Sequence, residues 1–174
     1  MNDRFAALYP AHLQIVKERH DKALAEAGFD HIIIFGGEIH IQFLDDSFYP
    51  FKVNPHFKAW VPIVDNPHCF IVYAPGKTPL LVYYQPVDYW YKPAGAPQGY
   101  WTDHFDVRVI GTADAAKEFF PTSGRTAFVG ESSDLHGGEA NPEALLNALH
   151  FERSWKTDYE IGRASCRERV SFLV

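Results

Sequence analysis

Apolar and polar positions recur with helical spacing near the N-terminus. Between Ala11 and Ala27 the charged residues are separated by apolar positions at Leu13, Val16, Ala23, Leu24 and Ala27. This spacing predicts an amphipathic helix, and Gly28 stands where a glycine commonly ends one. The next apolar run, from Ile32 to Phe35, is unbroken and β-branched, which is typical of a strand covered on both faces.

Two further apolar runs lie close together in the middle of the chain. Cys69 to Tyr73 and Leu80 to Tyr84 are joined by a short segment that contains Pro75 and Gly76. The length and composition of this connection predict a β-hairpin. Because a hairpin is antiparallel while helix-to-strand alternation favours parallel pairing, the sheet is expected to be mixed.

The second half of the chain continues the alternation. We expect strands at 107–110 and 126–129 and a helix at 113–120 that is stopped by Pro121. The predicted fold is therefore α/β, a three-layer sandwich with a mixed sheet. Asn141-Pro142 resembles an N-cap followed by proline at the first helical position, and Thr157 with Glu160 forms a capping box that announces another helix.

Composition and charge narrow the class of protein. The 174 residues allow one ordinary domain, and 47% hydrophobic with 22% charged residues is typical of a soluble globular protein. The net charge of −6 argues against nucleic-acid or membrane-surface partners. No apolar export or spanning segment is evident, so we expect a cytoplasmic protein.

Two aromatic loops stand out. The first, from Phe43 to Trp60, interleaves rings with adjacent carboxylates and two prolines that disfavour a long helix or a central strand. We expect Phe43 and Phe57 to lie in the core. Further rings of this loop that are candidates for a pocket wall are Phe48, Tyr49, Phe51 and Trp60. The second loop, 87–101, supplies Trp90 as a pocket candidate.

The sequence contains few other candidates for binding, metal-ligating or nucleophilic residues. Asp45 and Asp46 either cap the turn that follows them or supply negative charge to a ligand, and the residues alone favour the cap. The nine histidines are spread without a metal-binding motif, so we expect surface or hydrogen-bonded core positions. Cys69 lies in an apolar run and is expected to be a buried thiol.

The C-terminal segment differs from the rest. Ile161 to Val170 has a glycine and no apolar stripe, so it does not sustain the helix announced by Thr157, and it looks like the translation of a common sequencing adapter. We therefore expect a domain at 1–160 and a non-native tail at 161–174, and we exclude the tail from fold reasoning.

Three strings match one family: the loop from Phe43 to Pro62, the segment Pro86-Val87-Asp88-Tyr89-Trp90, and the segment Arg153 to Glu160. Together they resemble the bacterial Xaa-Pro dipeptidases, or prolidases, which include organophosphorus acid anhydrolases. The resemblance covers Leu8 to Ile161. It implies a creatinase-like N-terminal domain, acting in dimerisation and specificity, ahead of a catalytic domain of the pita-bread type.

The resemblance also implies a reaction and its cofactor. Enzymes of this family use two metal ions, usually Mn²⁺, to hydrolyse dipeptides with a C-terminal proline. The metal ligands are two Asp, one His and two Glu, and all of them lie in the catalytic domain, at positions after the one that corresponds to Ile161. We therefore expect no metal ligand and no catalytic residue in this chain, and no activity from it alone.

The partners implied are a dipeptide, the catalytic domain and a second subunit. Asp46, less strongly Asp45, and Trp90 are the residues expected to reach over the other subunit's active site and bind substrate there.

Two alternatives remain open. The chain could be a stand-alone ligand-binding or dimerisation module without catalysis. It could also belong to an aminopeptidase P or creatinase relative, since those enzymes share the architecture. The string from Tyr49 to Pro55 favours the dipeptidase branch.

Overall fold

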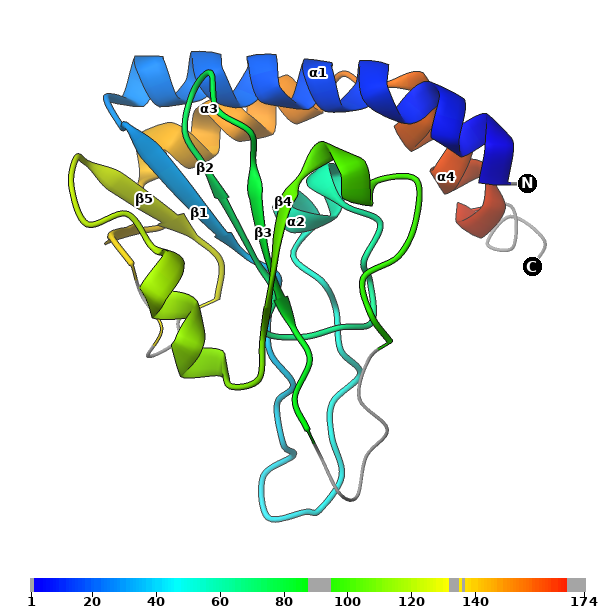
Figure 1. Ribbon diagram of the computed structural model, residues 1–174, viewed down its shortest axis with the longest axis vertical. Coiled ribbons are helices and arrows are strands. Elements are labelled where there is room, and N and C mark those ends of the chain that lie inside the picture. The colour runs from blue at the N-terminus through cyan, green and yellow to red at the C-terminus, as the bar shows by residue number, and fades with distance from the viewer. Residues whose placement is uncertain (1, 88–94, 132–134, 136, 169–174) are drawn as a thin grey trace.

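A mixed six-stranded sheet forms the centre of the protein (Figure 1). The computed structural model describes residues 2–87, 95–131, 135 and 137–168. The strand order is β4-β3-β2-β1-β5-β6, and only β2 runs antiparallel to its neighbours. The strands are β1 (His31–Phe35), β2 (Phe70–Tyr73), β3 (Leu80–Tyr84), β4 (Asp106–Ile110), β5 (Thr126–Val129) and β6 (Glu139–Ala140). The predicted mixed sheet and the β2-β3 hairpin are both confirmed.

Strand β1 lies between β2 and β5, with Ile32 opposite Tyr73 on one side and Ala127 on the other. Successive side chains of a strand point to opposite faces. Ile32 and Ile34 accordingly join one buried cluster, whereas Ile33 joins a second. The prediction of a strand covered on both faces is confirmed.

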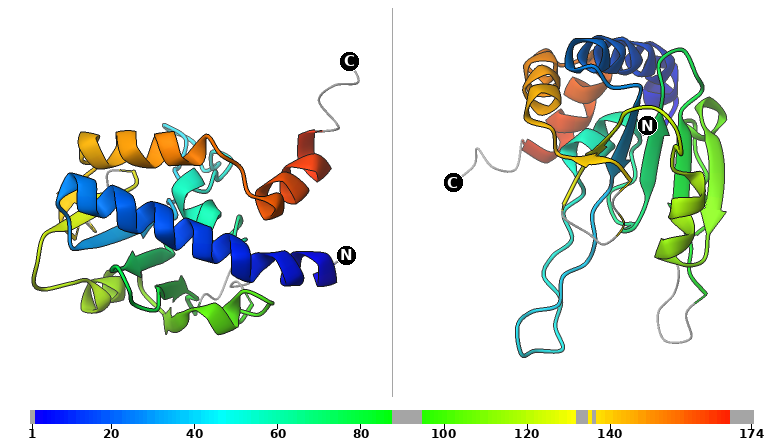
Figure 2. Two further views of the ribbon diagram at one scale, coloured as in Figure 1. Left: turned by 90° about the horizontal axis from the view of Figure 1, so that it is seen from above. Right: turned by 90° about the vertical axis from the view of Figure 1, so that its left-hand side faces the viewer.

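Helices form layers on the two faces of this sheet (Figure 2). Helices α1 (Asn2–Ala27), α3 (Glu143–Arg153) and α4 (Asp158–Glu168) pack together over one face, where their apolar residues join the cluster of Ile32. The opposite face is covered by η2 (Ala113–Phe119), a 3₁₀-helix where the sequence predicted a helix. The α/β architecture predicted from the sequence is therefore confirmed.

Helix α1 begins nine residues earlier than predicted and contains Pro10. Tyr9 explains why the additional turns form, because its side chain is fully buried. The Tyr9 hydroxyl donates to the carbonyl of Trp60 at 2.6 Å, and its ring meets Tyr159 edge-on at 5.3 Å. Tertiary packing outweighs the cost of a proline within the helix.

The starts of α3 and α4 test two capping predictions. The cap predicted at Asn141 is wrong: Pro142 is the N-cap, while the side chain of Asn141 accepts from Gly130 N at 3.0 Å and donates to Gly130 O at 2.7 Å. The capping box is confirmed, because Thr157 N donates to Glu160 Oε2 at 3.0 Å and Glu160 N donates to Thr157 Oγ1 at 3.2 Å. Helix α4 also continues to Glu168, beyond the point where the sequence predicted it to fade.

Candidate functional site

A long arm leaves β1 and returns to the short helix α2 (Pro55–Trp60), projecting from the edge of the sheet opposite α1 (Figure 1). The arm, residues 37–53, is held as a narrow hairpin by an antiparallel bridge between Ile41 and Phe48. Tyr49 N also donates to His40 O at 2.9 Å. The sequence predicted a loop from Phe43 to Trp60; its first part lies in this hairpin, whereas Pro55–Trp60 form helix α2.

Asn54 anchors the end of the arm, and sequence analysis missed this role. Its Oδ1 accepts from His56 N at 2.9 Å and so caps α2. Its Nδ2 donates to Phe35 O at 2.8 Å and to Val129 O at 3.3 Å, at the carboxyl ends of β1 and β5. The Asn-Pro pair was the available signal, since proline favours the first helical position after an asparagine cap.

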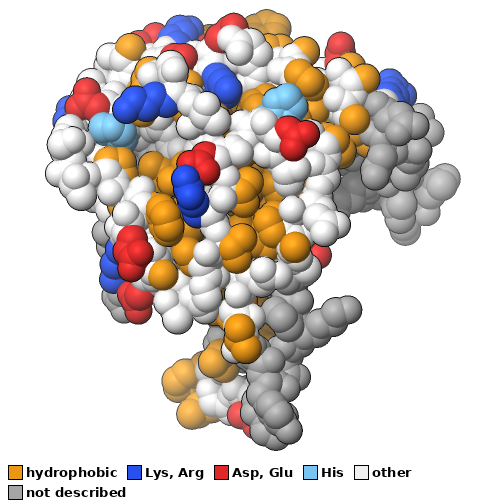
Figure 3. All heavy atoms as spheres, viewed as in Figure 1, with side chains coloured by type: hydrophobic (Ala, Val, Ile, Leu, Met, Phe, Trp, Pro, Cys, Tyr) orange, Lys and Arg blue, Asp and Glu red, His pale blue; other side chains and the backbone are white. Residues whose placement is uncertain are grey.

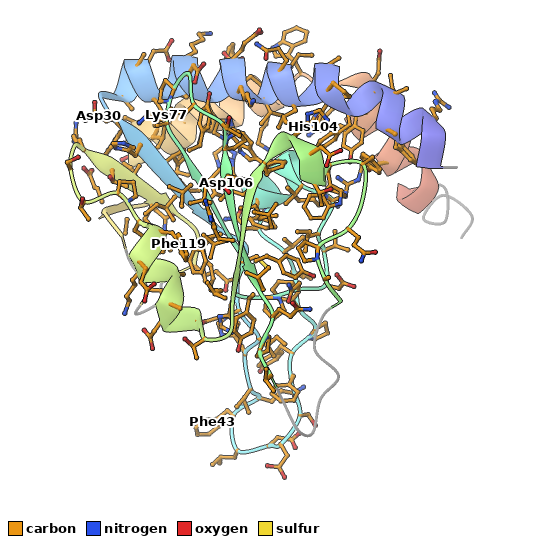
Figure 4. All side chains as sticks on the ribbon, viewed as in Figure 1. Asp30, Phe43, Lys77, His104, Asp106 and Phe119 are labelled. Carbon is orange, nitrogen blue, oxygen red and sulfur yellow. The ribbon has the colours of Figure 1, made fainter. Side chains whose placement is uncertain are left out.

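The tip of the arm is apolar and exposed. Phe43 has 88% and Leu44 90% of its side chain accessible. Phe43 points away from the body of the protein (Figure 4), and apolar atoms gather on this protrusion in the space-filling view (Figure 3). The prediction that Phe43 lies in the core is therefore wrong, whereas Phe57, with no exposed area, is confirmed in the core.

The two carboxylates beside this tip have different surroundings. Asp45 Oδ1 accepts from Asp46 N at 2.7 Å and from Ser47 N at 3.3 Å, so Asp45 holds the turn. The Asp46 side chain is exposed, and within the described part of the chain no hydrogen bond or ion pair reaches its carboxylate.

The other pocket candidates do not gather in one place. Trp60 is fully buried in the core, and Phe51 packs against Gly37 at the base of the arm. Tyr49 is 56% exposed on the arm. Trp90 lies outside the described residues, so its role in a pocket stays a prediction.

A hollow of about 820 Å³ lies between the arm and the described residues at 83–86 and 95–101. It lies at the carboxyl ends of β1 and β3, and ligands commonly bind at the carboxyl ends of strands in open α/β folds. Its described lining combines prolines and rings with a few polar groups: Ile39, Phe48, Pro62, Ile63, Asp65, Asn66, Pro67, His68, Tyr83, Tyr84, Pro86, Gly95, Ala96, Pro97, Gln98 and Trp101.

Buried histidines form hydrogen bonds with backbone carbonyl groups of the helices. His12 Nε2 donates to Ala59 O at 2.7 Å, and His20 Nδ1 donates to Val16 O at 2.7 Å. Burial is the main cause that lowers the pKa of His20 to about 4 and that of His56 to about 3. Among the described residues, no three His, Cys, Asp or Glu side chains are grouped so that they could hold a metal ion.

Cys69 and the surface histidine His40 complete the predicted chemistry. Burial raises the pKa of the Cys69 thiol to about 12, as expected for a core cysteine rather than a nucleophile. His40 Nε2 lies 3.0 Å from Glu131 Oε2 in an exposed pair. In the described part of the chain, no helix is long and apolar enough to cross a membrane.

Comparison with known proteins supplies the family. The model described as "Xaa-Pro dipeptidase, N-terminal domain" matches residues 7–151. The Xaa-Pro dipeptidase of Xanthomonas campestris pv. campestris is 44% identical over 159 residues, which are 90% of this chain and 36% of that protein. The Xaa-Pro dipeptidase of Shewanella loihica is 40% identical over 174 residues, which are 97% of this chain and 39% of that protein. The chain thus spans just over a third of these relatives.

Proposed function

The chain belongs to the Xaa-Pro dipeptidase family as its N-terminal domain, and from this premise we propose that it is the specificity and dimerisation domain of an enzyme that cleaves dipeptides ending in proline. The arm at residues 37–53 carries the proposal. It combines an exposed apolar tip with a carboxylate, Asp46, that has no partner among the described residues.

The apolar tip supports association with a second subunit. Isolated exposed apolar residues are common, but Phe43 and Leu44 are adjacent at the end of an ordered hairpin. Contiguous apolar surface of this kind marks an interaction site. We propose that the tip packs on the partner subunit and brings Asp46 to the edge of the partner's active site.

Asp46 would then recognise the free amine of the substrate. A carboxylate facing an ammonium in a partly water-excluded site forms a charge-assisted hydrogen bond. A longer peptide places a neutral amide where a dipeptide places its amine, so the same carboxylate rejects the longer peptide. Asp45 supports this arrangement by holding the turn beneath Asp46.

The metal centre implied by the family does not fit the residues described in this chain, because they contain no group of three suitable ligands. The manganese ions, the proton transfers and a cytoplasmic location remain predictions about the whole enzyme, and the role of this chain is binding and orientation.

Activity of the whole enzyme tests the role of Asp46. The full-length protein is assayed with Mn²⁺ on Leu-Pro and on the tripeptide Leu-Pro-Ala. Because a charge-assisted hydrogen bond contributes about 1.5–3 kcal/mol, Asp46→Asn is expected to lower kcat/KM for the dipeptide by about tenfold or more. The ratio of dipeptide to tripeptide cleavage should fall with it.

Asp103→Asn is the matched control, because Asp103 is also exposed but lies on the 3₁₀-helix η1 (Thr102–His104), away from the arm. It should leave both rates unchanged. Equal dipeptide preference in the Asp46→Asn enzyme and the unmodified enzyme would remove Asp46 from the specificity site.

A further inference from the structure

His68, on the wall of the hollow, has an unusual backbone conformation. Its φ of 55° lies in the left-handed region, which few residues other than glycine adopt. Its backbone N donates to Gly37 O at 2.9 Å, at the base of the arm. Strained positions of this kind persist where the surrounding structure holds them, and they concentrate at functional sites.

His68 lines the hollow, and its two ring nitrogens have different surroundings. Nδ1 is fully buried and has no hydrogen-bond partner in the described residues, whereas Nε2 is not among the buried atoms that lack a partner. A buried lone pair without a partner is tolerated better than a buried N–H, so the proton belongs on Nε2. Burial lowers the pKa of His68, and this effect outweighs the negative charge of Glu38, which raises it. The ring is therefore a neutral N–H donor near neutral pH.

Asp65 is the only acidic or cationic side chain among the described lining residues, given a neutral His68. No hydrogen bond or ion pair within the described chain reaches its carboxylate. Two other polar groups are already used: Asn66 Nδ2 donates to Tyr84 O at 2.8 Å, and Tyr83 OH donates to Gly95 O at 2.9 Å. The Asp65 carboxylate and the His68 ring are therefore available in the hollow, beside the side-chain amide of Gln98, the hydroxyl of Tyr84 and the indole N–H of Trp101.

We propose that this hollow binds a dipeptide zwitterion, with its ammonium on Asp65, a carboxylate or carbonyl oxygen on His68 Nε2, and its apolar side chain against Phe48 and Trp101. A volume of about 820 Å³ is in the range of small-molecule sites. The Asp65 carboxylate favours a ligand with a cationic group, the His68 N–H favours a hydrogen-bond acceptor, and the apolar lining favours an apolar side chain. The choice of a dipeptide among such ligands rests on the proposed function.

This site is separate from the one proposed at Asp46. Asp46 is on the exposed turn at the tip of the arm and does not line the hollow, which lies at the base of the arm. The hollow would therefore hold a second dipeptide molecule on the domain itself. Binding there needs neither a metal ion nor the partner's active site.

Binding to the ¹⁵N-labelled 174-residue chain, without metal, tests this assignment. Leu-Pro is titrated while backbone amide shifts are followed by NMR. We expect saturable shifts confined to residues 62–68, 83–86 and 98–101. N-acetyl-Leu-Pro, which has no ammonium, should bind about tenfold more weakly, as expected for the loss of one charge-assisted bond.

Two substitutions identify the groups. Asp65→Asn removes an exposed charge, and His68→Asn keeps a residue that tolerates the left-handed backbone while withdrawing the ring donor. Each should weaken binding of Leu-Pro several-fold, and His40→Asn, at an exposed site outside the hollow, should not. The amide spectrum reports folding of every variant, and Asp65→Asn decides the question if His68→Asn is unfolded.

Shifts that are absent or scattered over the surface would overturn the assignment. Equal binding of the acetylated peptide, or unchanged binding by Asp65→Asn, would also overturn it. None of these results bears on Asp46, whose role is measured by turnover of the whole enzyme. Failure of the two proposals is therefore distinguishable.

Discussion

His20 lies between a backbone acceptor and a side-chain donor. Nδ1 donates to Val16 O at 2.7 Å, and Nε2 accepts from Trp60 Nε1 at 3.2 Å. A second proton on His20 would place two N–H groups against each other inside the core. His56 is buried nearby and faces Arg153. Both rings are therefore held neutral by their surroundings.

This arrangement predicts loss of stability in mild acid. The folded-state pKa values, about 4 for His20 and about 3 for His56, are below the ordinary value of 6.5. Above pH 6.5 both states are neutral and stability is complete. As the pH falls below 6.5, only the unfolded chain takes up these protons, so each histidine lowers the free energy of unfolding by about 1.4 kcal/mol per pH unit.

Urea denaturation at several pH values measures this dependence. His56→Gln should make the decline between pH 6.5 and about 4 less steep by the contribution of one proton. Parallel profiles for His56→Gln and the unmodified chain would show that His56 is not held neutral in the fold.

Sequence analysis had mixed success at the level of single residues. It placed Phe57 and Cys69 in the core correctly, and Cys69 could be placed there because it begins an apolar run. It placed Phe43 there wrongly, because residue type alone does not reveal that a ring stands at the tip of an arm. The backbone bond of His68 and one of the side-chain bonds of Asn54 depend on residues far away in sequence, Gly37 and Val129 respectively.

The capping box at the start of α4 joins three elements. Thr157 Oγ1 accepts from Glu160 N and also lies 2.8 Å from His12 Nδ1. Because His12 Nε2 donates to Ala59 O, Nδ1 is the acceptor of this pair and the Thr157 hydroxyl donates to it. The cap of α4 is thus also one of the contacts that connect α4 to α1 and α2.

Thr157→Ala is expected to lower the free energy of unfolding by about 1–2 kcal/mol, the upper part of the range for losing an N-cap, since a buried histidine also loses its donor. Thr157→Ser keeps the hydroxyl and should retain most of the stability. Urea denaturation followed by circular dichroism compares the two. Equal losses in both variants would show that the methyl group, and not the hydroxyl, carries the effect.

Periodicity and turn chemistry predicted most of the elements. Helix α2 lies within the segment predicted as a loop and was missed. The strands β1 to β5, the helices α1 and α3, the position of η2 and the start of α4 were recovered, because most of the apolar runs are bounded by glycine or proline. The short β6 strand, the extension of α1 and the displaced cap at Asn141 were not. Each of these depends on contacts with a distant element: β5, Trp60 and Gly130 respectively.

At the scale of the whole molecule, the helices and the arm occupy opposite ends (Figure 1). Helices α1, α3 and α4 pack together over the sheet, whereas the arm and the hollow lie at the carboxyl ends of β1 and β3. The family was also recognisable from sequence, because its motifs fall on the arm and on the start of α4. The central claim is that the arm serves the active site of another subunit.

Mixed dimers of the full-length enzyme test that claim most directly. One subunit carries Asp46→Asn with an intact catalytic domain, and its partner carries intact Asp46 with a metal-ligand substitution in the catalytic domain. In the comparison dimer, a single subunit carries both substitutions and its partner is unmodified. Differently tagged subunits allow each pairing to be purified and assayed on Leu-Pro.

If the arm acts on the partner, the first dimer has one intact catalytic centre facing one intact arm, and it retains about half of the unmodified activity, since one of two centres works. The comparison dimer should be nearly inactive, because its only intact centre faces the altered arm. The reverse result, with the comparison dimer active and the first dimer inactive, would show that Asp46 serves its own subunit and would contradict the account.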